Sequence, residues 1–192
     1  MAHNFTRKSL VILIALGVLA AGLYWAFQPR TLISNNNFSD IPEGSAVGQR
    51  APDFSGITVD GKTIHISDYQ GDIVLVNLFA SWCGPCLAET PYLVEAYKNN
   101  REDVMIVGLN LQESPEAVSA YQDDFNVDYP LVLDPEGHFV KRYHPLGLPT
   151  SWFIDPEGIV RYVHSGPMDT RLIQKILDDI RSGNQPDPFT TG

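Results

Sequence analysis

The sequence predicts an α/β fold in which a mixed central sheet is flanked by helices, and three observations lead to this expectation. Two almost unbroken apolar runs, residues 72–80 and 104–111, have the length and composition of strands buried on both faces. A segment with a helical pattern follows the first run, and a segment that begins with helix-start residues follows the second. Near the end of the chain, two β-rich segments on either side of a Pro-Glu-Gly turn indicate an antiparallel hairpin. Strands separated by helices pair in parallel, whereas the two strands of a hairpin are antiparallel. The sheet should therefore contain both kinds of pair.

Local signals place the other elements. Alternating β-forming residues around Asp60-Gly61 predict an added N-terminal hairpin with a two-residue turn. Ser114 and Pro115 supply an N-cap and a first helical residue, and the closing helix has one apolar face. In chain order, the expected elements are the hairpin at 57–66, a strand at 72–80, a helix at 85–99, a strand at 104–111, a helix at 115–125, a short strand at 130–134, a short helix at 138–143, hairpin strands at 150–155 and 159–165, and a helix at 169–182.

The charge distribution excludes one class of partner. The 192-residue chain has a formal net charge of −10, with 44% hydrophobic and 19% charged residues, which is typical of a globular protein. All 23 acidic residues but only ten of the 13 basic ones lie from Asp40 onward, so that part of the chain has a net charge of −13. An acidic surface of this kind repels a phosphate backbone, and we therefore expect no binding to nucleic acid.

The sequence of the N-terminal region predicts that the globular domain is exported from the cytoplasm. The stretch from Leu10 to Phe27 carries no charge and would span roughly 27 Å as a helix, which is close to the thickness of a hydrocarbon core. Arg7 and Lys8 precede it and favour a cytoplasmic N-terminus. A signal peptide cleaved near Ala20-Ala21 is the alternative, and it would also export the domain. The expected organisation is a cytoplasmic segment at 1–9, a transmembrane signal-anchor at 10–27, a polar linker at 28–46, an extracytoplasmic globular domain at 47–183 and a loose tail at 184–192.

The two cysteines of the chain, Cys83 and Cys86, allow three interpretations. A structural disulfide would close so short a loop that it would stabilise the fold little. A zinc site needs about four ligands and only two thiolates are present, although a copper-binding module could combine the pair with His144 or His164. The third interpretation is a catalytic dithiol, and local chemistry favours it.

The catalytic interpretation follows from the junction at which Cys83 lies. A buried strand ends and a helix begins there, so the unpaired amides and positive dipole end of the helix favour the thiolate, which is the nucleophile. Gly84 permits a tight turn, and Pro85 fits the first helical turn. Cys86, one turn into the helix, lies within disulfide reach and should be less exposed. In the expected cycle, Cys83 attacks a substrate disulfide and Cys86 resolves the mixed disulfide.

The framing of this motif resembles thioredoxin. The sequence WCGPC follows a buried strand and precedes a helix with Pro91, and GLPTSWFID is similar to the cis-proline loop of that superfamily. The wider pattern over roughly residues 47–182 resembles the extracytoplasmic, membrane-anchored thiol-disulfide oxidoreductases of the ResA, TlpA and DsbE type, a redoxin branch related to AhpC/TSA proteins. The resemblance implies a thioredoxin-like fold, a cis Pro149, and catalysis without a metal or cofactor. It also implies a substrate-binding surface formed by Trp82, Gly84, Pro85, Leu148, Pro149 and Thr150, in which the Leu148 backbone pairs with an extended client.

One departure from thioredoxin concerns proton transfer. Cytoplasmic thioredoxins have a buried aspartate six residues before the first cysteine, and here that position is Asn77, which cannot carry a proton. Glu89, three residues after Cys86 on the same helical face, resembles the acid of the ResA-like subgroup and is the third expected catalytic residue. The alternative is an idle acid in the first helical turns.

The resemblance also implies the direction of the redox reaction and the partners of the protein. A Gly-Pro pair between the cysteines is similar to thioredoxin and favours a reductant, so the expected clients are exported disulfide-containing proteins, with apocytochrome c foremost, and the expected electron donor is a transmembrane protein. The alternatives that stay open are an oxidant, a peroxiredoxin-like peroxidase, a copper-delivery module that uses the cysteine pair and a histidine, and a redox-inactive adaptor.

Overall fold

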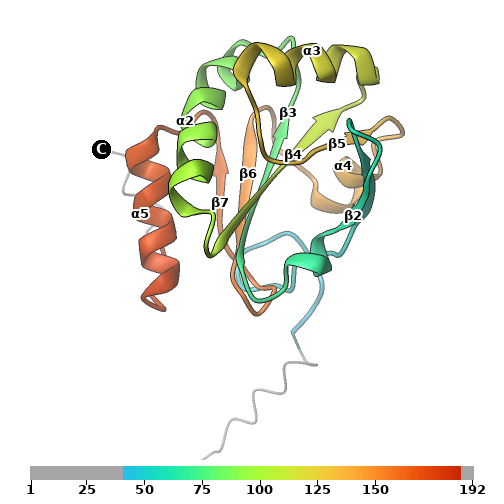
Figure 1. Ribbon diagram of the computed structural model, residues 1–192. Coiled ribbons are helices and arrows are strands. Elements are labelled where there is room, and N and C mark those ends of the chain that lie inside the picture. Colours follow the sequence, from blue (N-terminus) through green and yellow to red (C-terminus); the bar gives the residue numbers. More distant parts are fainter. Residues whose placement is uncertain (1–40, 187–192) are drawn as a thin grey trace, which may run out of the picture. The chain divides into compact units, whose positions relative to one another are not determined.

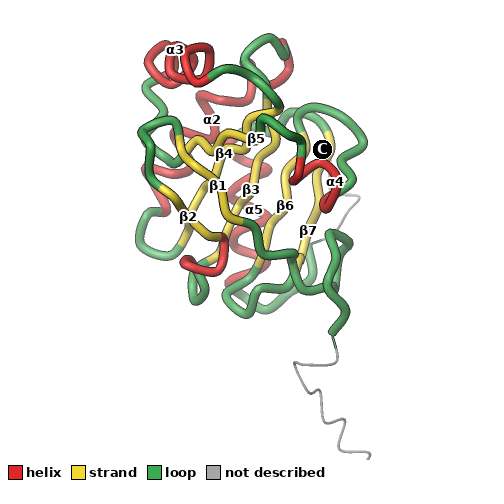
Figure 2. Tube along the Cα trace, turned by 90° about the vertical axis from the view of Figure 1, so that its right-hand side faces the viewer, coloured by secondary structure: helices red, strands yellow, loops and turns green. Residues whose placement is uncertain are grey.

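A computed structural model of the protein describes residues 41–186, and within them one sheet of seven strands forms the centre of the fold. The strands are β1 (Ser55–Thr58), β2 (Thr63–His65), β3 (Ile73–Phe79), β4 (Val104–Leu111), β5 (Leu131–Asp134), β6 (Thr150–Ile154) and β7 (Val160–Ser165). Their order in the sheet is β2-β1-β5-β4-β3-β6-β7. Figure 2 shows β2 and β7 at opposite edges of the sheet. Strand β3 pairs in parallel with β4 and antiparallel with β6, which confirms the mixed sheet.

Helices cover both faces of this sheet. They are the 3-10 helix η2 (Ile66–Tyr69), α2 (Gly84–Asn100), α3 (Pro115–Phe125), α4 (His138–Tyr143) and α5 (Thr170–Arg181). Apolar side chains of α2, α3 and α5 pack on one face, where α2 and α5 lie side by side (Figure 1). Those of α4 and η2 pack on the other face. The expected elements from the strand at 72–80 onward are all present, and the Ser114 hydroxyl caps α3 by accepting a bond from Ala117 N at 3.3 Å.

Strand β3 is buried along its whole length, as its apolar run predicts. Its residues alternate between the two faces: Ile73, Leu75 and Phe79 contact the core beneath α2, α3 and α5, whereas Val74, Val76 and Leu78 contact the core beneath α4. The same alternation places Asn77 on the face that α2 covers. A polar residue is therefore directed into the apolar layer next to the cysteine-bearing helix.

The N-terminal hairpin differs from the expected one in its turn. Four residues, 59–62, separate β1 from β2, so the predicted two-residue turn is wrong. The side chains of the loop bond among themselves: the Thr58 hydroxyl donates to the Asp60 carboxylate, and Asp60 pairs with the Lys62 ammonium at 2.7 Å. Thr58 N also donates to Lys62 O at 2.8 Å. Gly61 N donates to Thr58 O at 2.8 Å and Gly61 has φ +83°, a geometry typical of hairpin loops longer than two residues.

The folded part begins earlier than the expected boundary at residue 47. Arg50 N donates to Pro42 O at 3.0 Å and Gly44 N donates to Arg50 O at 2.9 Å, so residues 42–50 form a closed loop on the domain. Gly48 N donates to Val160 O at 2.8 Å, which attaches this loop to the start of β7. The chain therefore enters the domain at the end of the sheet opposite to the carboxyl end of β3.

The two ends of the expected organisation lie largely outside the described residues. Segments 1–9 and 10–27, most of the linker and residues 187–192 belong there. Among residues 41–186, no helix is long and apolar enough to cross a membrane. At the C-terminal side, Asn184 N donates to Asp179 O at 2.9 Å and the Gln185 side chain donates to Arg161 O, so the expected loose tail is bonded to the domain at its start.

Candidate active site at the amino end of helix α2

The two cysteines form a disulfide at the junction of β3 and α2. Their Cα atoms lie 5.2 Å apart, and Cys83 is the N-cap residue of the helix. Cys83 N donates to Ala80 O at 3.1 Å, which closes the turn that leads from the strand into the helix. Cys86 N points at Cys83 Sγ at 3.3 Å. An amide at the positive end of a helix, directed at this sulfur, stabilises a thiolate there once the disulfide is reduced.

The surroundings of the disulfide are asymmetric. The exposed fraction is 6% for Cys83 and 2% for Cys86, while Gly84 and Pro85 between them are exposed. Trp82, which directly precedes Cys83, has 68% of its surface exposed, a large value for a tryptophan. The first cysteine is therefore the more accessible one, and an aromatic ring projects into solvent beside it.

The loop before β6 lies at the same end of the sheet as the disulfide. The Leu148–Pro149 peptide bond is cis, as the resemblance to thioredoxin implies. Thr150 pairs with Leu78 across the β3–β6 ladder, so Pro149 lies level with the end of β3, just before the turn that carries Cys83. The Thr150 hydroxyl donates to Gly147 O at 2.8 Å within the loop. The structure thus brings Pro149 and Cys83, 66 residues apart in the chain, to one edge of the sheet.

Glu89 lies in the core, one helical turn after Cys86, and none of its surface is exposed. Its carboxylate accepts bonds from two neutral donors: Asn77 Nδ2 lies 3.0 Å from Oε2, and Met168 N lies 3.1 Å from Oε1. Burial raises the pKa of Glu89 from 4.5 to about 7, against the lowering effect of the bonds from Met168 and Asn77. A carboxyl with this pKa can both take up and release a proton near neutral pH.

The position of Asn77 explains how this carboxyl is held. Besides Glu89, the Asn77 amide donates to Ser151 Oγ at 2.9 Å, and Asn77 and Ser151 are direct partners across the β3–β6 ladder. The sequence marks Asn77 only as a departure from thioredoxin and gives no sign of its bond to Glu89. Ser151 and Met168 carry no sequence signal for this site, since their roles depend on the ladder register and on the loop that follows β7.

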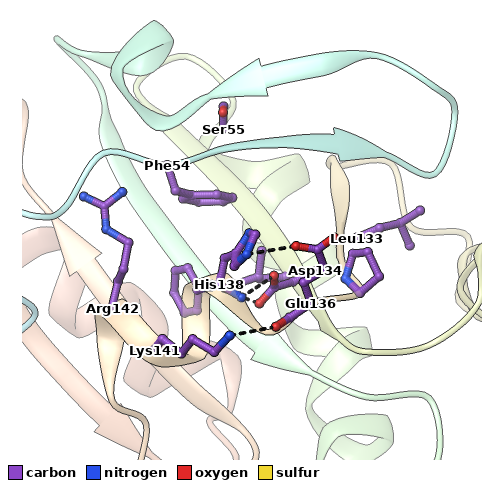
Figure 3. Close-up of a pocket in the computed structure, with 11 residues that line it drawn as sticks. Phe54, Ser55, Leu133, Asp134, Glu136, His138, Lys141 and Arg142 are labelled. Carbon is purple, nitrogen blue, oxygen red and sulfur yellow. Dashed lines mark hydrogen bonds and ion pairs between the residues drawn. The ribbon is translucent and has the colours of Figure 1, made fainter.

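A separate cavity of about 610 Å³ lies between β1, β5 and α4 (Figure 3). Its charged side chains already have partners: His138 pairs with Glu136 at 2.9 Å, and Arg142 pairs with Glu43 at 2.9 Å. The Asp134 carboxylate accepts bonds from the backbone amides at the start of α4, at 2.8 and 3.0 Å. This cavity contains no cysteine and stands apart from the disulfide. Within residues 41–186, no group of three or more His, Cys, Asp or Glu side chains comes together in a way that could hold a metal ion.

Comparison with known proteins gives consistent results. The model of the AhpC/TSA family matches residues 47–163. The chain is 35% identical over 142 residues to the thiol-disulfide oxidoreductase ResA of Bacillus subtilis, which covers 73% of this chain and 79% of ResA. Among solved structures, a thiol:disulfide interchange protein of the thioredoxin family from Chlorobium tepidum is 32% identical with a TM-score of 0.61, over 68% of this chain and 94% of that one. The exposed lipoprotein thioredoxin Etrx1 of Streptococcus pneumoniae is 30% identical with a TM-score of 0.61, over 67% of this chain and 99% of that one.

These similarities confirm the thioredoxin-like fold and agree with the disulfide at the start of α2. A reversible dithiol on such a fold exchanges disulfides with other proteins. The protein is a thiol-disulfide oxidoreductase, and its chain belongs to the AhpC/TSA family.

Proposed function

We propose that this protein reduces disulfides in exported proteins on the extracytoplasmic side of the membrane, with Cys83 as nucleophile, Cys86 as resolving thiol and Glu89 as proton acceptor and donor. The observation that carries the proposal is the Cys83–Cys86 disulfide at the amino end of α2. The buried Glu89 one turn further along supplies the group needed for proton transfer.

The reaction proceeds in two exchanges. In the reduced protein the Cys83 thiolate attacks one sulfur of a client disulfide; a Cys83–client bond forms, the client S–S bond breaks, and the second client sulfur leaves as a thiolate. The Cys86 thiolate then attacks Cys83 Sγ, which releases the first client sulfur and leaves the Cys83–Cys86 disulfide. Two electrons pass to the client, so the protein must be reduced again before the next cycle.

Glu89 provides the proton balance for the second exchange. Cys86 is buried and must lose its thiol proton before it can attack. The Glu89 carboxylate accepts this proton, and its pKa of about 7 lets it return the proton to the departing client thiolate. Its bonds from Asn77 and Met168 fix the carboxyl on the side of α2 that carries Cys86.

The proposed docking surface, location and partners are based on the residues around the disulfide and on the similar proteins. We propose that Trp82, Gly84, Pro85 and the loop at Leu148, Pro149 and Thr150 form the docking surface for an extended client segment. Residues 10–27 would attach the domain to the cell membrane, and the lipoprotein thioredoxin Etrx1, described as exposed, supports an extracytoplasmic location. Apocytochrome c is the client proposed by kinship, and a membrane protein that carries electrons outward is the proposed donor.

The direction of the reaction is tested by the reduction potential. We expect the Cys83–Cys86 couple to lie below roughly −230 mV, closer to thioredoxin, at about −270 mV, than to the oxidant DsbA, at about −120 mV. The measurement is equilibration of the purified protein against a graded series of reduced and oxidised glutathione. A potential near −120 mV would reverse the proposed direction and make the protein an oxidant.

The role of Glu89 is tested by the substitution Glu89→Gln, which keeps the shape of the side chain and removes its acid. We expect the pH dependence of client reduction to lose its inflection near pH 7 and the rate to fall by about 10²-fold, the lower end of general acid–base contributions. The rate of client reduction is measured from pH 5 to pH 9 in wild type and variant. An unchanged pH profile would remove Glu89 from the mechanism.

Folding stability provides the control for this variant. Because the pKa of Glu89 is raised in the folded state, the native protein binds a proton more tightly than the unfolded chain, and its stability falls as pH rises from about 4.5 to about 7. Glutamine has no such dependence. The free energy of unfolding of Glu89→Gln, measured relative to that of wild type, should therefore increase by up to about 3 kcal/mol between pH 4 and pH 8. Loss of activity with this gain in stability separates a chemical defect from misfolding.

A further inference from the structure

A carboxylate outside the proposed proton path contacts the turn that carries Cys83. Glu113 lies in the loop between β4 and α3, directly before the N-cap residue Ser114. Its Oε2 accepts a bond from Ser81 N at 2.7 Å, and its Oε1 accepts one from the Ser81 hydroxyl. Ser81 is the second residue of the four-residue turn that ends at Cys83. Both donors of Ser81 are therefore bound by one side chain from another part of the chain.

Glu113 is itself held in place from β4. Asn110 Nδ2 donates to Glu113 Oε2 at 2.6 Å, and Glu113 N donates to Asn110 Oδ1 at 3.1 Å. Asn110 has no exposed surface and pairs with Phe79, the last residue of β3, across the parallel ladder. Between the two, Gln112 has φ +56°, a left-handed conformation that residues other than glycine seldom adopt. The chain thus folds back at Gln112, and Glu113 is fixed between the ends of β3 and β4.

The consequence concerns the sulfur of Cys83. The helix can stabilise a Cys83 thiolate only while the sulfur stays close to the helix amides, of which Cys86 N is 3.3 Å away. Ser81 is two residues before Cys83, so a turn released from Glu113 would let that sulfur move. We propose that Glu113 is a positioning residue: its carboxylate clamps Ser81 and thereby holds Cys83 against the amino end of α2. The inference rests on the proposed function of Cys83 as nucleophile.

The sign of a pKa change distinguishes this role from a simple charge effect. A negative charge near Cys83 disfavours the thiolate, so if Glu113 acted only through its charge, its removal would lower the pKa of Cys83. If Glu113 acts as a clamp, its removal lets the sulfur leave the helix amides, and the pKa of Cys83 rises. The two interpretations therefore predict opposite shifts in one measurement.

The experiment measures the pKa of Cys83 from the pH dependence of iodoacetamide alkylation, in a Cys86→Ala background where Cys83 is the only thiol. The variants are Glu113→Ala, Ser81→Ala and Glu113→Gln, with Glu116→Gln as a matched control that removes an exposed charge three residues away. We expect Glu113→Ala to raise the pKa of Cys83 by about one, which is tenfold less thiolate below the pKa. Ser81→Ala should raise it less, Glu113→Gln should restore most of the wild-type value because its amide oxygen still accepts from Ser81, and Glu116→Gln should leave it unchanged.

Client reduction by the same variants, with Cys86 present, should fall in the same order. A double-mutant cycle completes the test: because Ser81 acts through Glu113, Ser81→Ala should add little to Glu113→Ala. If Glu113→Ala fails to fold, Ser81→Ala carries the test, since it removes only one hydroxyl. A lowered or unchanged pKa of Cys83 in both alanine variants, or strictly additive effects, would overturn the inference while leaving the proposed function intact. A wild-type Cys83 with the pKa of free cysteine, about 8.5, would overturn the proposed function itself.

Discussion

Replacing Cys83 by serine should reduce client reduction to the uncatalysed rate. A serine hydroxyl at the same position stays protonated at neutral pH and cannot open a disulfide, whatever the amide of Cys86 contributes at 3.3 Å. The measurement is the reduction of a client disulfide with the protein held reduced by an external dithiol. Turnover comparable to that of wild type would contradict the assignment of Cys83 as nucleophile.

The matched control is Cys86→Ser, which keeps the nucleophile and removes the resolving thiol. This variant should accumulate a mixed disulfide between Cys83 and the client in about one-to-one ratio, visible by mass spectrometry as an adduct that a dithiol releases. A variant that neither turns over nor forms the adduct would mean that Cys86 also supports the reactivity of Cys83.

Substituting Asn77 by aspartate should produce the second large effect, in stability and in pH dependence. Asn77 Nδ2 lies 3.0 Å from Glu89 Oε2, and neither residue has more than 3% of its surface exposed. An aspartate there would place a second carboxyl against the first in a buried site, where the two cannot both ionise without a large cost. The pair would share a proton over a wide pH range, and the second ionisation would move above the wild-type value of about 7.

The expected change of stability with pH follows from the linkage between proton binding and folding. A carboxyl pair whose upper pKa is raised in the folded state loses stability as pH rises through that range. Asn77→Asp should therefore be destabilised relative to wild type on the order of 3 kcal/mol above pH 8, and much less at pH 5, where the pair retains protons. Chemical denaturation at both pH values measures this, and client reduction should shift its pH dependence to more alkaline values. Equal destabilisation at pH 5 and pH 8 would show that the effect is steric and not electrostatic.

The main elements of the fold could be predicted from the sequence because they depend on local patterns. The apolar run at 72–80 is long enough for a strand and lacks alternation, which indicates burial on both faces, and β3 is buried throughout. Ser114 and Pro115 marked the start of α3 because capping is a property of adjacent residues. The length of the N-terminal turn differs from the expected one because Asp60-Gly61 belong to a longer loop, in which Gly61 N donates to Thr58 O at 2.8 Å and Gly61 has φ +83°.

The environment of the site could be predicted only in part. The Cys83–Cys86 pair is adjacent in sequence, and helical spacing already places Glu89 on the side of Cys86. The contact between Asn77 and Glu89 depends on which face of β3 meets α2. The alternation of side chains along that strand could have indicated it, because Asn77 is two residues from both Leu75 and Phe79 and so lies on the same face. The contact between Glu113 and Ser81 had no such signal, because it depends on a left-handed residue and a parallel ladder that join positions 32 residues apart.

The place where the chain joins the domain bears on how clients reach it. Residues 42–50 are fastened beside the start of β7, whereas the cysteine turn follows the far end of β3, so the attachment point and the redox centre occupy opposite poles of the sheet. Under the proposed attachment through residues 10–27, the dithiol therefore lies at the end of the domain remote from the point where the chain enters it, and the segment that enters the domain does not cover the cysteine turn.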